Sequence, residues 1–313
     1  MSAPQIQQAP VTPVAVAAVP RRSRVPRALW VPWRAVATVW ANRLARVGIV
    51  ILAVLVLLAI FAPLIAPYSP TDTDFGRSVS PDAAHWLGTT GSGQDVLSRL
   101  LYGARVSLLV AFAAGILSTV VAVAVGLFAG YLSGFAEETI NFVVNLFLVI
   151  PALPLMIVIA TYSPSRGVGV IVLVVVLTGW AWGARVLRAQ TATLRGRDFV
   201  AAAEFSGERP HRIVFREILP NMTSLVAASF LGAATAAVLG EAGLEFLGLG
   251  NPNTISWGTM LFWAQNDNAL LVGQWPQILA PGLAIALLAA SLSLINFGVD
   301  ALSNPRLREG VAR

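Results

Sequence analysis

The chain has 313 residues, of which 57% are hydrophobic and 12% are charged, and its formal net charge is +6. Soluble globular domains are about 45–50% apolar and about 25% charged, so this composition, with a mean hydropathy of +0.75, excludes a water-soluble globular protein. The absence of Cys excludes disulfides and thiolate metal sites, and neither His85 nor His211 is expected to bind a metal or act as a base.

The N-terminal part of the chain predicts a cytoplasmic tail of residues 1–46 and a first transmembrane helix at 47–67. Residues 1–20 are low in complexity and rich in Pro, Ala and Val, so no fold is expected there. The apolar run that follows is longer than the about 7–15 residues of a signal-peptide core, and it therefore predicts an uncleaved membrane anchor. Residues 68–104 are predicted to form an extracytoplasmic segment.

Five more spans are predicted within a core of residues 105–303. A charge at the centre of a bilayer is costly and about 20 apolar residues cross the hydrocarbon, so long uncharged intervals between charged residues predict spans. The intervals are 105–137, 138–166, 166–185, 217–241 and 267–300. The sequence therefore predicts an all-α membrane protein with six transmembrane helices.

The segment at 246–266 is predicted to be a loop, because it mixes apolar residues with Gly, Pro, Asn and Ser. Trp257 and Trp263 are expected to pack this loop at the membrane interface. With six spans, 17 Arg residues lie on the side of the termini and four on the other side. By the positive-inside rule, both termini are predicted to be cytoplasmic.

Prolines and glycines predict the local shape of two spans. Pro151 and Pro154 are expected to kink span three. Gly126 and Gly130 form a GxxxG pattern in span two, which favours close packing of helices.

The segment between spans four and five predicts two short helices joined by a tight corner. Gly207 suits the left-handed end of the first helix, and Pro210 suits the first position of the second. Glu208 and Arg212 are four residues apart in the favourable order for an ion pair. From the residues alone, an ordinary polar loop or an amphipathic helix on the lipid surface stays open. Nucleic-acid binding is not expected, because the bilayer holds the loop at both ends.

The same segment resembles the EAA loop of ABC importer permeases, here at 195–220. The resemblance rests on Ala202 and Ala203, on Gly207 four residues later, and on the Leu219-Pro220 pair. Two departures are visible. Ala201 stands where the family often has Glu, and Glu217 occupies the place of an Ile, which follows one residue later.

Three further stretches resemble the C-type subunit of dipeptide and oligopeptide permeases. At 85–108, Thr90 and Gln94 replace an Asp and an Arg that are often seen there. At 241–261, Glu245 stands where Ser is frequent, and the third stretch is DALSNPRLR at 300–308. Four motifs in the expected order make the resemblance more specific than any one of them.

The resemblance implies a type I ABC importer permease bundle with a cytoplasmic coupling-helix loop, in the bacterial plasma (inner) membrane. This chain would be a subunit of an ATP-driven peptide importer and would form half of the translocation path, with residues 105–303 as the permease core and 304–313 as a cytoplasmic tail. Its implied partners are a homologous permease subunit, two cytoplasmic ATPase subunits, an extracytoplasmic substrate-binding protein, the peptide substrate and membrane lipid. No catalytic, cofactor or metal site is expected, because a phosphate-binding loop needs a Lys and the chain has none; the partner ATPases would bind ATP and Mg.

Two sets of site residues follow from these interpretations. The residues expected to couple to the ATPase are Ala201, Ala202, Ala203, Gly207, Arg209, Leu219 and Pro220. The residues expected to form an outer lid or to contact the binding protein are Asp95, Arg99, Glu241, Glu245 and Trp257. Asp95 and Arg99 are also expected to pair with each other along one helix, being four residues apart.

Two alternative functions remain. A proton-coupled secondary carrier would need an ionisable residue inside the membrane, and none is predicted at a span centre, with Glu241 placed near a span end. An ABC importer for another cargo, such as nickel chelates or glutathione, also agrees with the sequence.

Overall fold

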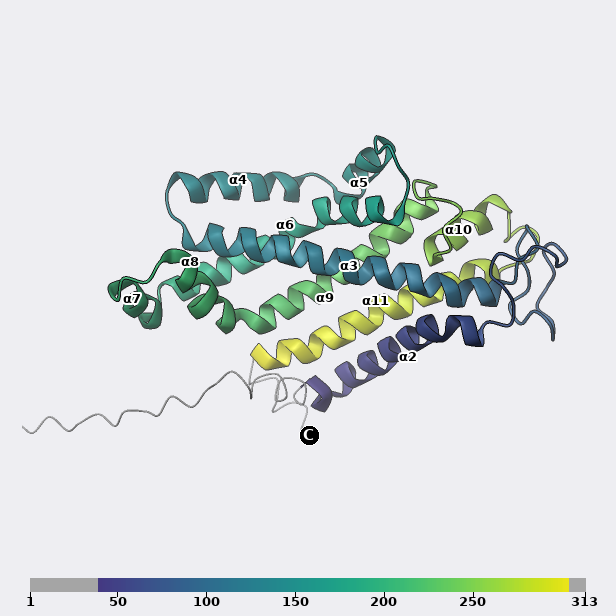
Figure 1. Cartoon of the computed structure of the whole chain (residues 1–313), viewed down its shortest axis with the longest axis horizontal. Coiled ribbons are helices and arrows are strands. Elements are labelled where there is room, and N and C mark those ends of the chain that lie inside the picture. Colours follow the sequence, from purple (N-terminus) through teal and green to yellow (C-terminus); the bar gives the residue numbers. More distant parts are fainter. Residues whose placement is uncertain (1–38, 304–313) are drawn as a thin grey trace, which may run out of the picture.

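The structure is a computed structural model, and it describes residues 39–303. Within this range no strand forms, and one isolated β-bridge joins Thr89 to Asp95. Figure 1 shows the long helices lying side by side in a single bundle. The predicted all-α class is confirmed. The predictions for residues 1–20 and for the tail at 304–313 fall outside the described residues.

Five helices of the described chain are long and apolar enough to cross a membrane. They are α2 (Arg43–Ile65), α3 (Val96–Tyr131), α6 (Val168–Arg195), α9 (Thr223–Phe246) and α11 (Pro276–Ser303). The pair of α4 (Phe135–Val149) and α5 (Ala152–Thr161) forms a sixth span if it is counted once. These helices agree with the six predicted spans.

The third span is broken rather than gently kinked. Helices α4 and α5 meet at an angle of 89°. Ile150 ends α4 in an extended conformation, and Pro151 precedes the first residue of α5. Proline lacks an N–H and disfavours a helical residue before it, which explains why the helix ends at this point. The kink predicted at Pro151 is confirmed, whereas Pro154 lies inside α5 without interrupting it.

The prediction of a loop at 246–266 is wrong for its second half, which forms the helix α10 (Trp257–Asn266). Ser256 begins this helix with a capping box, in which its hydroxyl accepts from the Thr259 N–H while the Thr259 hydroxyl accepts from the Ser256 N–H. Trp257 is buried inside the chain rather than at an interface, and its indole N–H donates to the Leu100 carbonyl at 3.0 Å. Two polar residues of this stretch, Ser256 and Thr259, thus satisfy each other by capping, which sequence composition did not reveal.

The two ends of the bundle differ in structure (Figure 1). At one end lie α7 (Asp198–Phe205) and α8 (Pro210–Ile213). At the other lie α10 and the connection between α2 and α3, residues 66–95, here called the α2–α3 segment. The start of α2 and the end of α11 both lie toward the α7 end.

Glycines allow α3 to pack closely against α6. A Cβ atom on Gly126 would lie 2.7 Å from the Ala184 carbonyl oxygen, and one on Gly130 would lie 2.6 Å from the Arg188 carbonyl oxygen. Both distances are shorter than a van der Waals contact, so only glycine permits this approach. The GxxxG pattern thus serves packing within the chain, as small residues commonly do between membrane helices.

Replacing Gly130 with Ala should destabilise the bundle, because the added methyl group would overlap the α6 backbone. Overpacking of this kind costs about 1–3 kcal/mol. We expect the melting temperature of the purified chain in detergent to fall by at least about 2 °C. Gly282→Ala in α11 is the matched control, since nothing lies within 4 Å of its added methyl group. An equal fall in both variants would contradict this packing.

Candidate functional site

The α7–α8 loop, residues 196–222, has the predicted form of two short helices joined at a corner. Gly207 lies between them with φ +75°, a left-handed conformation that a side chain disfavours. Pro210 occupies the first turn of α8, and Glu208 forms an ion pair with Arg212 at 3.0 Å. These local predictions are confirmed. Beyond α8 the chain continues through a π-helical turn and a 3-10 turn into α9.

The loop has an apolar underside that anchors it to the bundle. Val200, Ile213 and Val214 are buried and belong to the same core cluster as residues of α3 and α6. The opposite surface is open, and the Phe205 side chain at the end of α7 is 94% exposed. Phe205 therefore lies on the open surface of the loop, away from the core that anchors its underside.

The predicted coupling residues are spread over both surfaces of the loop. The exposed ones are Ala202, Gly207, Arg209 and Pro220, and the partly buried ones are Ala201, Ala203 and Leu219. A Cβ on Gly207 would meet nothing within 4 Å, so its side is open to a partner. The structure therefore brings these residues together in one surface element, and their contact with an ATPase stays a prediction.

A polar contact ties α7 to the end of α3. The Tyr131 hydroxyl, on the last residue of α3, donates to the Glu204 carboxylate at 2.9 Å. The Arg195 guanidinium lies 5.5 Å from the centre of the Tyr131 ring and donates to the Leu132 carbonyl at 3.3 Å. The three side chains of Tyr131, Glu204 and Arg195, here called the α3–α7 tie, join the loop to two long helices.

Sequence reasoning missed Tyr131, Glu204 and Phe205. Tyr131 and Glu204 are 73 residues apart, so no local spacing connects them. Phe205 stands two residues before the predicted corner at Gly207, and this position was the local signal available in the sequence.

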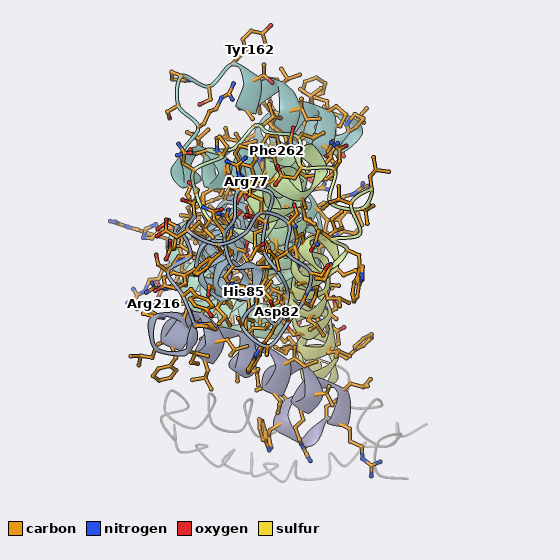
Figure 2. All side chains as sticks on the ribbon, turned by 90° about the vertical axis from the view of Figure 1, so that its right-hand side faces the viewer. Arg77, Asp82, His85, Tyr162, Arg216 and Phe262 are labelled. Carbon is orange, nitrogen blue, oxygen red and sulfur yellow. The ribbon has the colours of Figure 1, made fainter. Side chains whose placement is uncertain are left out.

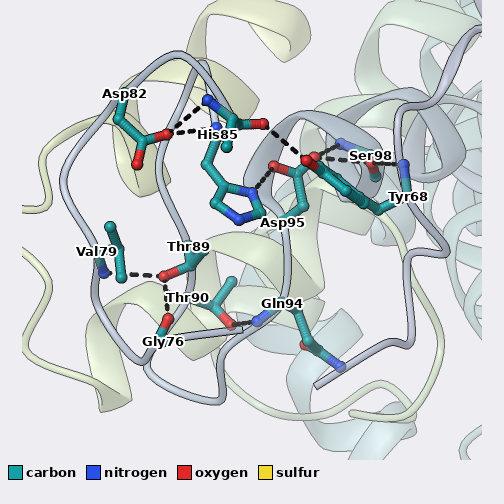
Figure 3. A network of polar contacts seen from close by, with 11 residues as sticks. Tyr68, Gly76, Val79, Asp82, His85, Thr89, Thr90, Gln94, Asp95 and Ser98 are labelled. Carbon is teal, nitrogen blue, oxygen red and sulfur yellow. Dashed lines mark hydrogen bonds and ion pairs between the residues drawn. The ribbon is translucent and has the colours of Figure 1, made fainter. Parts of the chain in front are cut away.

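The α2–α3 segment is held by a network of short polar contacts (Figure 3). Asp95 precedes α3, and one of its carboxylate oxygens accepts from the backbone N–H and the hydroxyl of Ser98, both at 2.7 Å. The other oxygen lies 3.0 Å from His85 Nδ1. The Thr89 hydroxyl donates to the Gly76 carbonyl at 2.6 Å, which closes the segment on itself.

The predicted pair of Asp95 and Arg99 does not form. Ser98 and His85 occupy the Asp95 carboxylate, which acts as the N-cap of α3. Arg99 donates to the Gln94 side chain instead. Two oppositely charged residues four apart on a helix form an ion pair only when neither has a stronger interaction elsewhere. The free N–H groups of a helix N-terminus offer an acidic residue such an interaction.

Glu241 and Glu245, which were predicted to form an outer lid or to contact a binding protein, are buried inside the chain. Helix α9 continues to Phe246, and the two side chains are 0% and 1% exposed. Glu241 accepts from the Ser107 hydroxyl of α3 at 3.2 Å, and Glu245 accepts from the Ser256 hydroxyl at the start of α10. These acids therefore join three helices inside the chain.

The other three residues that were predicted to form an outer lid or to contact a binding protein are also buried. They are Asp95, Arg99 and Trp257. Figure 2 looks onto this end of the bundle and labels Arg77, which is exposed. Trp86 and Trp275 are also largely exposed there. The buried residues build the covering of this end, while exposed residues such as Arg77 form its surface.

Comparison with known proteins agrees with this helical membrane architecture. Residues 122–309 match the family described as binding-protein-dependent transport system inner membrane component, and residues 32–81 match the N-terminal TM domain of oligopeptide transport permease C. The chain is 34% identical over 278 residues to the oligopeptide transport system permease protein OppC of Mycobacterium tuberculosis (strain ATCC 25618 / H37Rv), which covers 86% of this chain and 94% of that protein.

Two dipeptide transport system permease proteins, both DppC, are similarly close. That of Alkalihalophilus pseudofirmus is 34% identical over 283 residues, 88% of this chain and 91% of that protein. That of Bacillus subtilis (strain 168) is 30% identical over 271 residues, 85% of this chain and 83% of that protein.

The chain therefore belongs to the family of binding-protein-dependent inner membrane transport components, and its bundle is the type I permease fold of ABC importers. Within this family it is a C-type subunit of the oligopeptide and dipeptide permeases. It is thus a multi-pass membrane permease subunit of an ABC importer.

The α3–α7 tie predicts a coupled loss of stability. Tyr131→Phe and Glu204→Ala should each lower the free energy of local opening of α7 by about 1–2 kcal/mol, because a hydrogen bond to a charged group is lost. The double variant should lose little more than either single variant, since both remove the same bond. Hydrogen–deuterium exchange of the α7 amides measures these changes.

Glu208→Ala is the control for this prediction. It breaks the ion pair with Arg212, which lies within the loop and does not reach α3. An exposed pair of this kind contributes about 0.3–0.5 kcal/mol, so its loss should be smaller. Additive losses in the Tyr131 and Glu204 double variant would show that the two side chains act independently.

Proposed function

We propose that this chain is the permease subunit of an ATP-driven peptide importer that couples to a cytoplasmic ATPase through the α7–α8 loop. The observation that carries the proposal is the exposed Phe205 on a loop whose underside is anchored. Because Val200 and Ile213 fix the loop from below, a force on Phe205 moves the bundle rather than the loop alone. The family membership supports the same proposal, since an importer of this class has its motor in another polypeptide.

The proposed orientation places the α7–α8 loop and both chain termini in the cytoplasm. The Arg residues support this orientation through the positive-inside rule. The α2–α3 segment and α10 then lie outside, where a substrate-binding protein would deliver cargo. A homologous permease subunit would supply the other half of the path, and two ATPase subunits would bind the two coupling loops.

The proposed mechanism is a rigid-body change driven from the loop. Closure of the two ATPases would draw the coupling loops together, and the α3–α7 tie would transmit this displacement to α3. Since α3 packs closely on α6, the two helices would move as one body. ATP binding in the partners would thus shift the equilibrium between an inward-open and an outward-open path.

Short peptides are the proposed cargo. The relatives named as dipeptide and oligopeptide permeases support this choice over nickel chelates or glutathione. A proton-coupled secondary carrier is the weaker alternative. The buried Glu241 and Glu245 do supply acids within a span, but their hydrogen bonds to Ser107 and Ser256 give them a structural role in joining helices.

No enzymatic activity is proposed for this chain. A phosphate-binding loop of the P-loop type requires a Lys, and the chain contains none. Among residues 39–303 no three His, Asp or Glu side chains group so as to hold a metal ion. The proposal that ATP and Mg bind only in partner subunits follows from the first of these points.

Gly207→Val should uncouple transport. A β-branched residue in a left-handed conformation costs roughly 1–2 kcal/mol or more, so the corner between α7 and α8 would reshape. We expect the variant to insert normally but to lose peptide uptake in cells at normal expression. Normal uptake by this variant would remove the coupling assignment.

Phe205→Ala should weaken the ATPase contact directly. Loss of a central aromatic contact at an interface costs about 2 kcal/mol, which corresponds to about a 30-fold rise in Kd. Binding of the purified ATPase to the permease in nanodiscs measures this effect. Tyr162→Ala is the control, because the Tyr162 side chain is 85% exposed but lies just before the start of α6, whereas α7 follows the end of α6. Equal binding by wild type and Phe205→Ala would contradict the proposal.

The purified chain should hydrolyse no ATP on its own, since its motor would reside in partner subunits. Phosphate release from the chain in nanodiscs measures this directly, and addition of the ATPase subunits serves as the positive control. Hydrolysis by the chain alone would contradict a non-catalytic role.

A further inference from the structure

A polar cavity of about 290 Å³ lies where the α2–α3 segment meets the region around α10. Its walls come from parts of the chain that are far apart in sequence. The lining residues that matter here are Thr90, Gln94, Arg99, Asn253, Trp263 and Asp267. None of the residues that the coupling proposal uses lies in it.

Arg99 supplies a buried positive charge to this cavity. Its side chain belongs to the first turn of α3, and the residue is only 6% exposed. An arginine stays protonated in proteins, and a buried charge is costly unless it is paired. Within the described chain Arg99 donates to a single side chain, that of Gln94, which is neutral. Its remaining donors can therefore serve a ligand.

Asp267 supplies a negative charge to the same cavity. It attracts Arg99 electrostatically, yet the two side chains form no direct ion pair. Its carboxylate accepts no hydrogen bond from residues 39–303. A Cβ atom on Gly91 would lie 2.5 Å from the Asp267 side chain, so the absence of a side chain at Gly91 makes room for this carboxylate.

Two neutral side chains, those of Thr90 and Gln94, also line this cavity (Figure 3). Neither of them can neutralise Arg99 or Asp267. The two opposite charges therefore remain available on the walls of one small cavity.

We propose that this cavity binds a small zwitterion, with its carboxylate on Arg99 and its ammonium group on Asp267. Arginine binds carboxylates through two parallel hydrogen bonds, and one acidic side chain suits one ammonium group. The cavity volume of about 290 Å³ lies just below the range of typical ligand pockets, about 300–1,000 Å³, so it suits a small ligand such as a dipeptide and not a long peptide. A dipeptide with free ends is therefore the ligand, and this identification rests on the proposed peptide transport.

The test uses the assembled permease and ATPase complex in nanodiscs, without ATP and without the binding protein. The probes are radiolabelled L-alanyl-L-alanine, its N-acetyl derivative and its C-terminal amide. We expect the free dipeptide to bind at least tenfold more tightly than either blocked form. Arg99→Met should weaken binding of the free dipeptide at least tenfold. Asp267→Asn should do the same for the free dipeptide but leave the N-acetyl derivative unchanged.

Two controls keep this test informative. Arg77→Gln removes an exposed arginine from the same end of the bundle and should leave all three affinities unchanged. Gly91→Ala should weaken binding of the free dipeptide without removing either charge, because its methyl group would displace the Asp267 carboxylate. This second variant keeps the proposal testable if Arg99→Met does not fold.

Several outcomes would overturn the proposal. They are undetectable binding of the free dipeptide to the wild-type complex, equal affinity for free and blocked forms, and equal effects of Asp267→Asn and Arg77→Gln. Unchanged binding of the free dipeptide to Arg99→Met would also overturn it. Because no ATP is present, failure of this test leaves the coupling proposal intact, and normal uptake by Gly207→Val leaves this proposal intact.

Discussion

Close contact between the backbones of α3 and α6 is the constraint on which the rest of the structure depends. Gly126 and Gly130 allow it, because any side chain there would overlap α6. Helix α6 leads into the α7–α8 loop, and α3 ends at Tyr131, which binds Glu204 of α7. The loop is thus attached to the bundle through both helices of its closest pair. A displacement of the loop is consequently a displacement of these two helices.

Helix α3 also reaches the end of the bundle that lies opposite the α7–α8 loop. Helix α3 has 36 residues and so extends about 54 Å at 1.5 Å per residue. Near its start, Arg99 lines the polar cavity and Ser107 bonds to Glu241 of α9. One rigid element therefore joins the surface proposed for the motor to the region proposed for the cargo. This continuity gives a physical route for coupling between two sites that never touch.

Sequence predicted the parts of this structure that depend on local chemistry. The spans followed from the cost of charge in hydrocarbon, and the corner at Gly207 and Pro210 followed from backbone preferences. The parts it missed depend on contacts between distant residues. Trp257 and Glu245 look like surface residues in a polar stretch, and only the packing of α10 against α9 shows that they are buried. The α3–α7 tie was missed for the same reason.

The most direct measurement of the coupling proposal is site-specific photo-crosslinking from the tip of α7. A benzoylphenylalanine placed at Phe205 in the assembled transporter would report which molecule covers this exposed position. A covalent adduct with the ATPase subunit is the expected result, with no adduct to that subunit from the same group placed at Tyr162. Adducts only with lipid or with the extracytoplasmic binding protein would contradict the proposed role of the loop.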